Sequence, residues 1–261
     1  MTDPTQRFTG RVGDYARYRP GYPPELLDLL RSECGLTEGA VVADVGSGTG
    51  ILARLFLDNG NRVIMVEPNE EMRHAGECLL SGHGRFESVA GTAEAMTLPE
   101  SSADLITAGQ AFHWFEPEAA RKEFARVLKP GGMVVLLWND RRKHGGPFLE
   151  AYERLLQEHA TDYAQVEHGR EGSLEEIRGF FAPNPVHTAT FVNKQVLDHD
   201  GLLGRLRSSS YVPAEGEPGH REMLDELERV FRDHEGGGQV VMEYDTVVYY
   251  GLLSGTALSG A

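Results

Sequence analysis

The stretch ADVGSGTG, residues 43–50, decides the fold of this 261-residue chain. It continues an apolar run that begins at Ala40, and it places three glycines, at 46, 48 and 50, within five positions. A uniformly apolar run predicts a strand covered on both faces, and glycine is used where the backbone needs positive φ or a close neighbour. An amphipathic helix is expected next, at 51–59. The unpaired N–H groups at the start of such a helix predict a ligand site at the turn.

Two classes of ligand use a strand, a glycine turn and a helix in this order. A dinucleotide site needs the spacing GxGxxG, and Ile51 stands where its last glycine belongs. Asp44, just before the turn, suits an ammonium or sulfonium group better than a pyrophosphate. Glu67, about 20 residues beyond the glycines, is placed to accept hydrogen bonds from ribose hydroxyls, a feature shared with NAD sites. The turn therefore favours S-adenosylmethionine, which carries both cations, over a dinucleotide.

Beyond the turn, short apolar runs alternate with amphipathic stretches, which predicts an α/β fold with a parallel sheet. Strands are expected at 40–45, 62–67, 85–91, 103–109 and 133–138, helices at 22–34, 51–59, 69–80 and 117–128, and a turn at 129–132. The pattern changes after residue 139. Expected there are a helix at 147–160, a polar stretch over 161–185, a strand at 187–197, helices near 200–209 and 218–235, and a last strand at 239–253.

Five segments carry a family resemblance in their order and spacing. They are VADVGSGTG (42–50), VEPNEEM (66–72), GTAEAMTLP (91–99), GQAFHWF (109–115) and EFARVLKPGG (123–132), and RSSSYVP (207–213) extends the likeness. The chain resembles class I S-adenosylmethionine-dependent methyltransferases, specifically the small-molecule branch of the methyltransferase-11 and trans-aconitate-methyltransferase type. The resemblance implies a Rossmann-like, seven-stranded, mostly parallel sheet with an antiparallel last strand, helices on both faces and a small helical cap or insertion.

The resemblance also implies four parts and a set of site residues. The parts are a lid over 1–36, a cofactor-binding core over 37–140, a cap with a sixth strand over 141–238, and a final strand and tail over 239–261. Implied cofactor contacts are Asp44, Gly46, Ser47, Gly48 and Gly50 at the methionine part, Glu67 at the ribose, Pro68, Asn69, Met72, Thr92, Ala93 and Glu94 on the adenine side, and Gln110 and Ala111 near the sulfonium. Many relatives carry aspartate where Thr92 stands, so a backbone contact or Glu94 is expected to substitute.

The candidate residues on the acceptor side have competing interpretations. Arg19, in the arm DYARYRPGY (14–22), is expected to pair with the cofactor carboxylate beneath a lid, with Tyr15 or Tyr18 closing the chamber; a surface segment is the alternative. His113 is the candidate general base, because imidazole titrates near neutrality, or else it only fixes its loop. Candidate substrate contacts are Tyr18, Trp114, Arg207 and Tyr211, and the basic cluster 141–144 is a further site for a substrate carboxylate. Solvated side chains on a packed helix are the alternative for the arginines.

Charge and composition limit the partners. The formal charge of −15, from 40 acidic against 25 basic residues, repels nucleic-acid phosphates and favours a small-molecule substrate. Two cysteines, at 34 and 78, are too few for a disulfide framework and are expected to be buried thiols. No dense cluster has metal-ligand spacing, so metal-independent, in-line methyl transfer to an oxygen, nitrogen or carboxylate nucleophile is expected. No membrane-length apolar run and no signal-peptide layout at 1–10 occur, which predicts no membrane partner and a cytoplasmic location.

Two other functions remain open at this point. One is a protein of methyltransferase fold that binds S-adenosylmethionine without methyl transfer, such as a cyclase, a decarboxylase or a sensor, because fold does not fix function. The other is an NAD(P)-dependent oxidoreductase, which Ile51 and Asp44 disfavour. The Asn/Asp-Pro-Pro-aromatic signature of amino-methylating nucleic-acid enzymes is missing, in agreement with the acidic composition.

Overall fold

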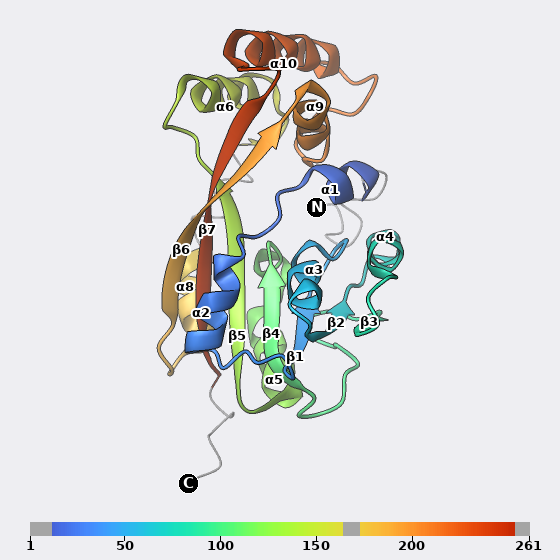
Figure 1. Ribbon diagram of the computed structural model, residues 1–261, viewed down its shortest axis with the longest axis vertical. Coiled ribbons are helices and arrows are strands. Elements are labelled where there is room, and N and C mark those ends of the chain that lie inside the picture. Colours follow the sequence, from blue (N-terminus) through green and yellow to red (C-terminus); the bar gives the residue numbers. More distant parts are fainter. Residues whose placement is uncertain (1–11, 164–172, 254–261) are drawn as a thin grey trace.

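A seven-stranded sheet in the order β3-β2-β1-β4-β5-β7-β6 organises the computed structural model, which describes residues 12–163 and 173–253 (Figure 1). The strands are β1 (Val41–Val45), β2 (Arg62–Val66), β3 (Phe86–Val89), β4 (Ala103–Gly109), β5 (Leu128–Arg141), β6 (His187–Leu197) and β7 (Val240–Leu252). Strands β1 to β5 are mutually parallel, and β7 runs antiparallel to both β5 and β6. The expected mostly parallel sheet with an antiparallel last strand is confirmed.

Helices cover both faces of the sheet because its central strands are apolar on both sides. On one face, α2 (Glu25–Glu33) and α3 (Ile51–Asp58) pack with residues such as Val42, Val63 and Val135. On the other face lie α5 (Pro117–Val127) and α8 (Ser173–Phe181). The sequence does not predict α8, because its few apolar residues are set in the polar stretch 161–185. Ile177, Phe180 and Phe181 bury it nevertheless. Residues 164–172 of the expected polar stretch lie outside the part of the chain that the structure describes.

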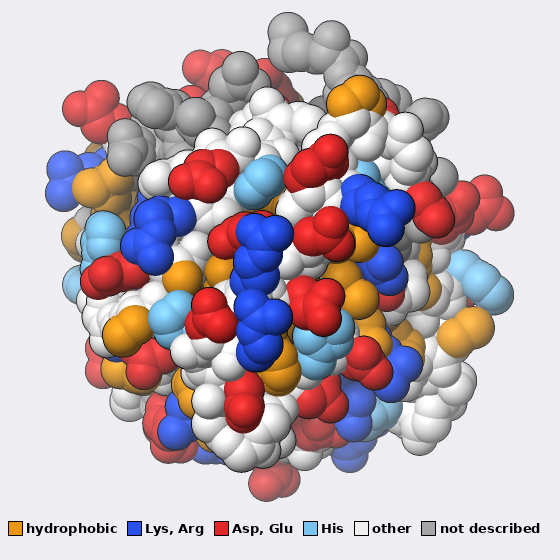
Figure 2. All heavy atoms as spheres, turned by 90° about the horizontal axis from the view of Figure 1, so that it is seen from above, with side chains coloured by type: hydrophobic (Ala, Val, Ile, Leu, Met, Phe, Trp, Pro, Cys, Tyr) orange, Lys and Arg blue, Asp and Glu red, His pale blue; other side chains and the backbone are white. Residues whose placement is uncertain are grey.

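The upper part of Figure 1 is a cap with an apolar core of its own. It consists of α6 (Pro147–His159), α9 (His199–Arg207), α10 (His220–His234) and the extended ends of β6 and β7. Met223, Leu227 and Val230 are buried on one side of α10 at helical spacing. Figure 2 looks onto this end of the molecule and shows the acidic and basic side chains of the described residues interspersed on it.

The N-terminal helix α1 (Val12–Tyr18) connects the cap to the core. It contacts α9 of the cap and α4 (Glu70–Leu80) of the core, and it lies between them in Figure 1. Helix α2 instead buries Leu26, Leu27 and Leu30 against the sheet. The expected lid over 1–36 is therefore too long, because α2 belongs to the core. Residues 1–11 of that lid and 254–261 of the expected tail lie outside the described residues.

Two smaller expectations need correction. The expected turn at 129–132 lies inside β5, where Ala103 pairs with Leu128 and Leu105 with Met133, so the four residues form an excursion within the strand. Cys78 is exposed and Cys34 only partly buried, so neither is a fully buried thiol. Within residues 12–163 and 173–253, every helix is too short or too polar to cross a bilayer.

Candidate active site

A cavity of about 790 Å³ opens where β1, β2, β4 and β5 end at their carboxyl sides. The carboxyl ends of parallel strands meet at one edge of a sheet, which is where α/β proteins bind ligands. The glycine turn and the ends of β2 and β4 form its core side, while Arg205 and Tyr211 line it from the cap. Tyr15 and Arg19, on α1 and the residue after it, line it as well. Its volume is within the range of small-molecule sites, roughly 300–1,000 Å³.

The glycine turn owes its composition to backbone conformation and to protein neighbours. Gly46, Gly48 and Gly50 all have positive φ, at 64°, 57° and 81°. A Cβ on Gly46 would lie 2.6 Å from the Cβ of Ala111. The nearest neighbours of a Cβ on Gly48 would be Met72 and Tyr15, at 3.3 and 3.9 Å. Side chains at these positions are therefore excluded by strain and packing, and the turn leaves its outer side open to the cavity.

Asp44 is a buried carboxylate with one unused oxygen. Its Oδ1 accepts a hydrogen bond from the Thr107 hydroxyl at 2.9 Å. In the part of the chain that the structure describes, its buried Oδ2 and the buried Oγ of Ser47 have no hydrogen-bond partner. Burial raises the pKa of Asp44 to about 7; the Thr107 hydroxyl and the backbone N–H of Ala53 oppose this shift, and the Glu67 carboxylate adds to it. Both residues line the cavity, so a cationic ligand there would satisfy an acid that the protein leaves unpaired.

Glu67 joins the glycine turn to the next helix. Its Oε2 accepts a hydrogen bond from the Gly48 N–H at 2.8 Å, and its Oε1 accepts one from the Asn69 N–H at 2.9 Å. Burial raises the pKa of Glu67, and these two N–H groups oppose the shift. Each carboxylate oxygen keeps a second lone pair. Glu67 is thus held rigidly at the cavity with acceptor capacity for two hydroxyls.

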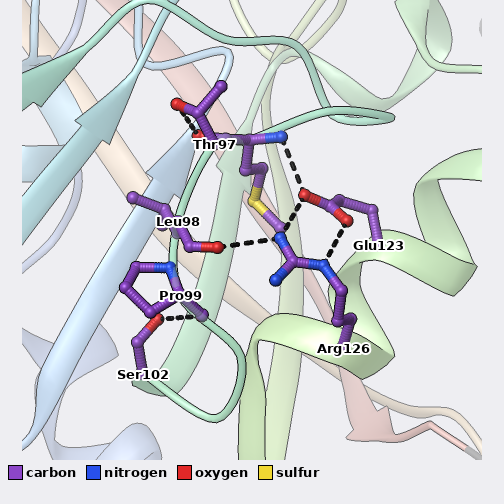
Figure 3. Close-up of polar contacts among 7 residues, drawn as sticks. Thr97, Leu98, Pro99, Ser102, Glu123 and Arg126 are labelled. Atoms are coloured by element: carbon purple, nitrogen blue, oxygen red, sulfur yellow. Dashed lines mark hydrogen bonds and ion pairs between the residues drawn. The ribbon is translucent and has the colours of Figure 1, made fainter.

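The segment after β3 carries residues 92–94, which are expected on the adenine side, and it is fastened to α5 (Figure 3). Arg126 donates to the Leu98 carbonyl at 2.8 Å and forms an ion pair with Glu123 at 2.7 Å. Glu123 in turn accepts the Met96 N–H at 2.9 Å. These contacts fix the backbone of the loop without entering the cavity.

Pro68, Asn69, Met72, Thr92, Ala93 and Glu94 all line the cavity. Asn69 also caps α4, accepting the Met72 N–H at 2.9 Å. Glu94 accepts the Glu116 N–H at 2.8 Å, which ties this loop to the start of α5. One Glu94 oxygen is therefore engaged by the protein, and the backbone N–H and C=O of Thr92 are hydrogen-bonded to Ala95.

The end of β4 lies at the cavity in a strained conformation. Gln110 has φ of 60°, which is costly for a residue with a side chain, and such strain gathers at functional sites. It leads through Ala111 into the 3₁₀ helix η2 (Phe112–Trp114). Phe112 is buried in the core, whereas His113 and Trp114 are exposed at the cavity, with ring centroids 4.6 Å apart.

The segment after α1 is fixed to three other elements. Arg19 lies over the Tyr15 ring, 4.9 Å from its centroid, and donates to the Ser208 carbonyl at 2.8 Å. Asn139 at the end of β5 and Asn193 of β6 both donate to the Gly21 carbonyl, at 3.0 and 2.8 Å. Burial lowers the pKa of Arg19, and the positive charge of Arg205 adds to the shift. These contacts hold α1 as a roof over the glycine turn.

Some expected site residues lie elsewhere. Gly50 is absent from the cavity lining, because it faces inward, where a Cβ would lie 2.6 Å from Leu80. The Tyr18 ring packs against Gly204 of α9, and Arg207 is exposed outside the cavity. Tyr211 and Trp114 do line it.

The basic cluster 141–144 is largely neutralised by acids of the protein itself. Arg141 forms a buried ion pair with Glu153. Arg142 pairs with Asp245 at 2.6 Å and Glu243 at 3.2 Å. Lys143 reaches the cavity, while His144 is exposed outside it. The cluster as a whole is therefore not an open carboxylate site.

Sequence reasoning missed several residues that line the cavity, among them Tyr22, Asn139 and Arg205. A Cβ on Gly109 would collide with the Tyr22 hydroxyl. Burial raises the pKa of Tyr22, and the carboxylate of Asp44 contributes to the shift. A polar residue ending an apolar strand was the available signal for Asn139. GLLGRLR is compatible with a cap over the substrate or with a packed helix that carries solvated arginines, and it does not distinguish Arg205 from Arg207.

The residues present fit S-adenosylmethionine. Asp44 and Ser47 offer buried, unpartnered polar atoms among the described residues beside the glycine turn, as its cationic amino-acid part requires. Glu67 is fixed as an acceptor at the end of β2, one strand away. The acid at Asp44 and the absence of a third glycine at position 51 disfavour a pyrophosphate.

Comparison with known proteins agrees with this site. A family model for a methyltransferase domain matches residues 43–136. An uncharacterized methyltransferase of Schizosaccharomyces pombe is 34% identical over 245 residues, covering 93% of this chain and 95% of that protein. One from Mycobacterium bovis is 38% identical over 144 residues, covering 55% of this chain and 56% of that protein.

The fold comparison points the same way. The structure of a protein assigned as a type II methyltransferase from Anaeromyxobacter dehalogenans superposes with a TM-score of 0.66 at 22% identity, covering 90% of this chain and 97% of that one. None of these names carries a substrate, so the trans-aconitate-like branch stays a prediction. The matched domain, the full-length relative and the cavity at the glycine turn together show that the chain belongs to the class I S-adenosylmethionine-dependent methyltransferases.

Proposed function

We propose that this enzyme methylates an oxygen, nitrogen or carboxylate nucleophile of a small molecule, by in-line displacement and without a metal ion. The observation that carries the proposal is the unpartnered buried oxygen of Asp44 in a cavity roofed by α1 and the cap. A roofed cavity supports a small acceptor over a polymer. The net charge of −15 also argues against nucleic acid.

The chain's own residues would bind the cofactor and the acceptor, orient them toward each other and keep water out of the cavity. S-adenosylmethionine supplies a methyl group on a cationic sulfur. Asp44 and Ser47 would hold its amino group, Arg19 its carboxylate, Glu67 its ribose, and residues 92–94 its base. Fixing two reactants in line and keeping water out contributes several kcal/mol to such a reaction.

The acceptor supplies the nucleophile. A carboxylate acceptor needs no base. A hydroxyl or amine acceptor needs one, and His113 is the candidate because it lies at the cavity after β4.

Calorimetry followed by a product assay tests the proposal. We expect S-adenosylmethionine and S-adenosylhomocysteine to bind the purified protein and NADH not to bind. We also expect S-adenosylhomocysteine to form when a panel of small acids, alcohols and amines is added. Binding of NADH in place of S-adenosylmethionine contradicts the assigned cofactor. Tight cofactor binding without product across the panel contradicts methyl transfer to a small molecule and favours a binding-only role.

A further inference from the structure

Arg205 of α9 is a buried cation without an acid. Its side chain is 6% exposed and lines the cavity. Its hydrogen bonds go to three neutral hydroxyls: Nε donates to Tyr244 at 3.1 Å, and Nη1 donates to Ser209 at 3.0 Å and to Ser208 at 3.5 Å. Over residues 12–163 and 173–253, Nη2 donates no hydrogen bond, and no ion pair involves Arg205.

A buried guanidinium without a counter-ion is costly to the protein. Arginine does not deprotonate in proteins, and a buried charge is normally paired. Hydroxyls orient the group but do not neutralise it. Arg19 increases the imbalance, because it is a second partly buried cation close enough for each charge to disfavour the other, and it donates a hydrogen bond to the neutral Ser208 carbonyl. An anionic ligand would relieve this local excess of positive charge.

The neighbouring arginines provide the contrast. Arg141 has Glu153, and Arg142 has Asp245 and Glu243. Of these, Arg141 lines the same cavity as Arg205, so the fold balances the charge of one cavity arginine and leaves the charge of the other open. The acidic composition makes the contrast sharper, because 40 carboxylates are available and none pairs with Arg205 among the described residues.

Arg205 lies on the acceptor side of the cavity. Its partner Tyr244 is on β7, where it pairs with Arg141, the last residue of β5. Asp44 and Glu67 belong to β1 and the end of β2, and β4 and β5 separate those strands from β7. Arg19 lies between the two groups, because it contacts Tyr15 above the glycine turn and Ser208 beside Arg205.

We propose that the methyl acceptor is a small acid, and that Arg205 binds its acidic group through the open Nη2. The proposal rests on the proposed function, since it names the substrate class of the same site. The hydroxyls of Tyr244, Ser208 and Ser209 hold the guanidinium toward the cavity and leave one edge for the ligand. Charge-assisted hydrogen bonds of this kind are stronger than neutral ones and select an anion over its amide.

Matched probes test the proposal on the full chain. Benzoate, benzamide and phenyl phosphate, and glutarate with glutaramide, are titrated by calorimetry into protein saturated with S-adenosylhomocysteine. We expect at least one acid to bind roughly tenfold or more tightly than its amide. The carboxylate and phosphate arms then identify the kind of acid. Equal affinities for acids and amides, or no binding of any acid at millimolar concentration, overturn the proposal.

Two variants assign the preference to Arg205. Arg205→Gln is expected to abolish the acid-over-amide preference, and Arg205→Lys is expected to keep part of it, while both retain affinity for S-adenosylhomocysteine. A preference that survives in Arg205→Gln contradicts the assignment. If that variant does not fold, the wild-type protein still decides the proposal: a preference for the acid over its amide that weakens as salt is added supports it, and the lack of such a preference contradicts it. Failure of S-adenosylhomocysteine to bind contradicts the proposed function alone, and the acids are then titrated into the free protein.

Discussion

Replacing Asp44 with asparagine separates two effects of the buried carboxylate: its cost to the stability of the fold and its contribution to cofactor binding. Burial raises the pKa of Asp44 from 3.8 to about 7. Because the folded protein keeps a proton that the unfolded chain has released, stability falls as the pH rises from about 4 to about 7, and then levels off. At about 1.4 kcal/mol per pH unit, the ionised form costs about 4 kcal/mol above pH 7. Asparagine keeps the acceptor for Thr107 and carries no such cost.

The expected result is a variant that is more stable and less able to bind the cofactor. The free energies of unfolding of Asp44→Asn and wild type, from urea titrations, should diverge by about 2 kcal/mol between pH 5 and pH 7 and become parallel above about pH 8. At pH 8 the variant should bind S-adenosylmethionine at least about tenfold more weakly. Asp225→Asn, at an exposed position of α10, is the matched control and should change neither quantity. A pH-independent gap would refute the raised pKa, and unchanged affinity would refute the contact with the cofactor.

Four further variants test other parts of the site. Gly50→Ala should lose about 2–4 kcal/mol of unfolding free energy in urea, from left-handed strain and the clash with Leu80; wild-type stability would show that the turn can move. Glu67→Gln should weaken S-adenosylhomocysteine binding roughly tenfold by calorimetry, whereas equal affinity excludes the ribose contact. His113→Ala should lower kcat and leave cofactor affinity intact; if affinity falls and kcat does not, His113 is no base. Arg126→Ala should weaken cofactor binding severalfold through the loop it fastens, and Arg229→Ala, in an exposed ion pair on α10, should not.

Local patterns predicted the sheet because each strand carries its own signal. The central strands are mostly apolar, and β6 and β7 alternate, so the existence of the strands and their order along the chain followed from periodicity. Helix α8 did not follow, because Ile177, Phe180 and Phe181 are a short apolar set that becomes helical on packing against α5 and the sheet.

The cofactor half of the site was also readable, with one error of interpretation. Asp44, Gly46, Gly48 and Glu67 sit within two strand-to-helix turns, where close spacing in the sequence means closeness in space. Gly50 belongs to the same motif, yet it serves packing against Leu80 and Met65. The sequence shows that a side chain is excluded at such a position, and only the structure shows what excludes it.

The sequence by itself determined the order of strands and helices along the chain, the glycine turn at the cavity and the acid buried beside it, because these depend on neighbours within a few residues. The tertiary structure alone decided which charges stay unpaired. Arg141, Arg142 and Arg205 look alike in the sequence, and partners 12, 101 and 103 positions away neutralise the first two. Charge balance is a property of positions in space, and chain folding brings Arg205 to hydroxyls on β7 and at the end of α9 instead of to an acid.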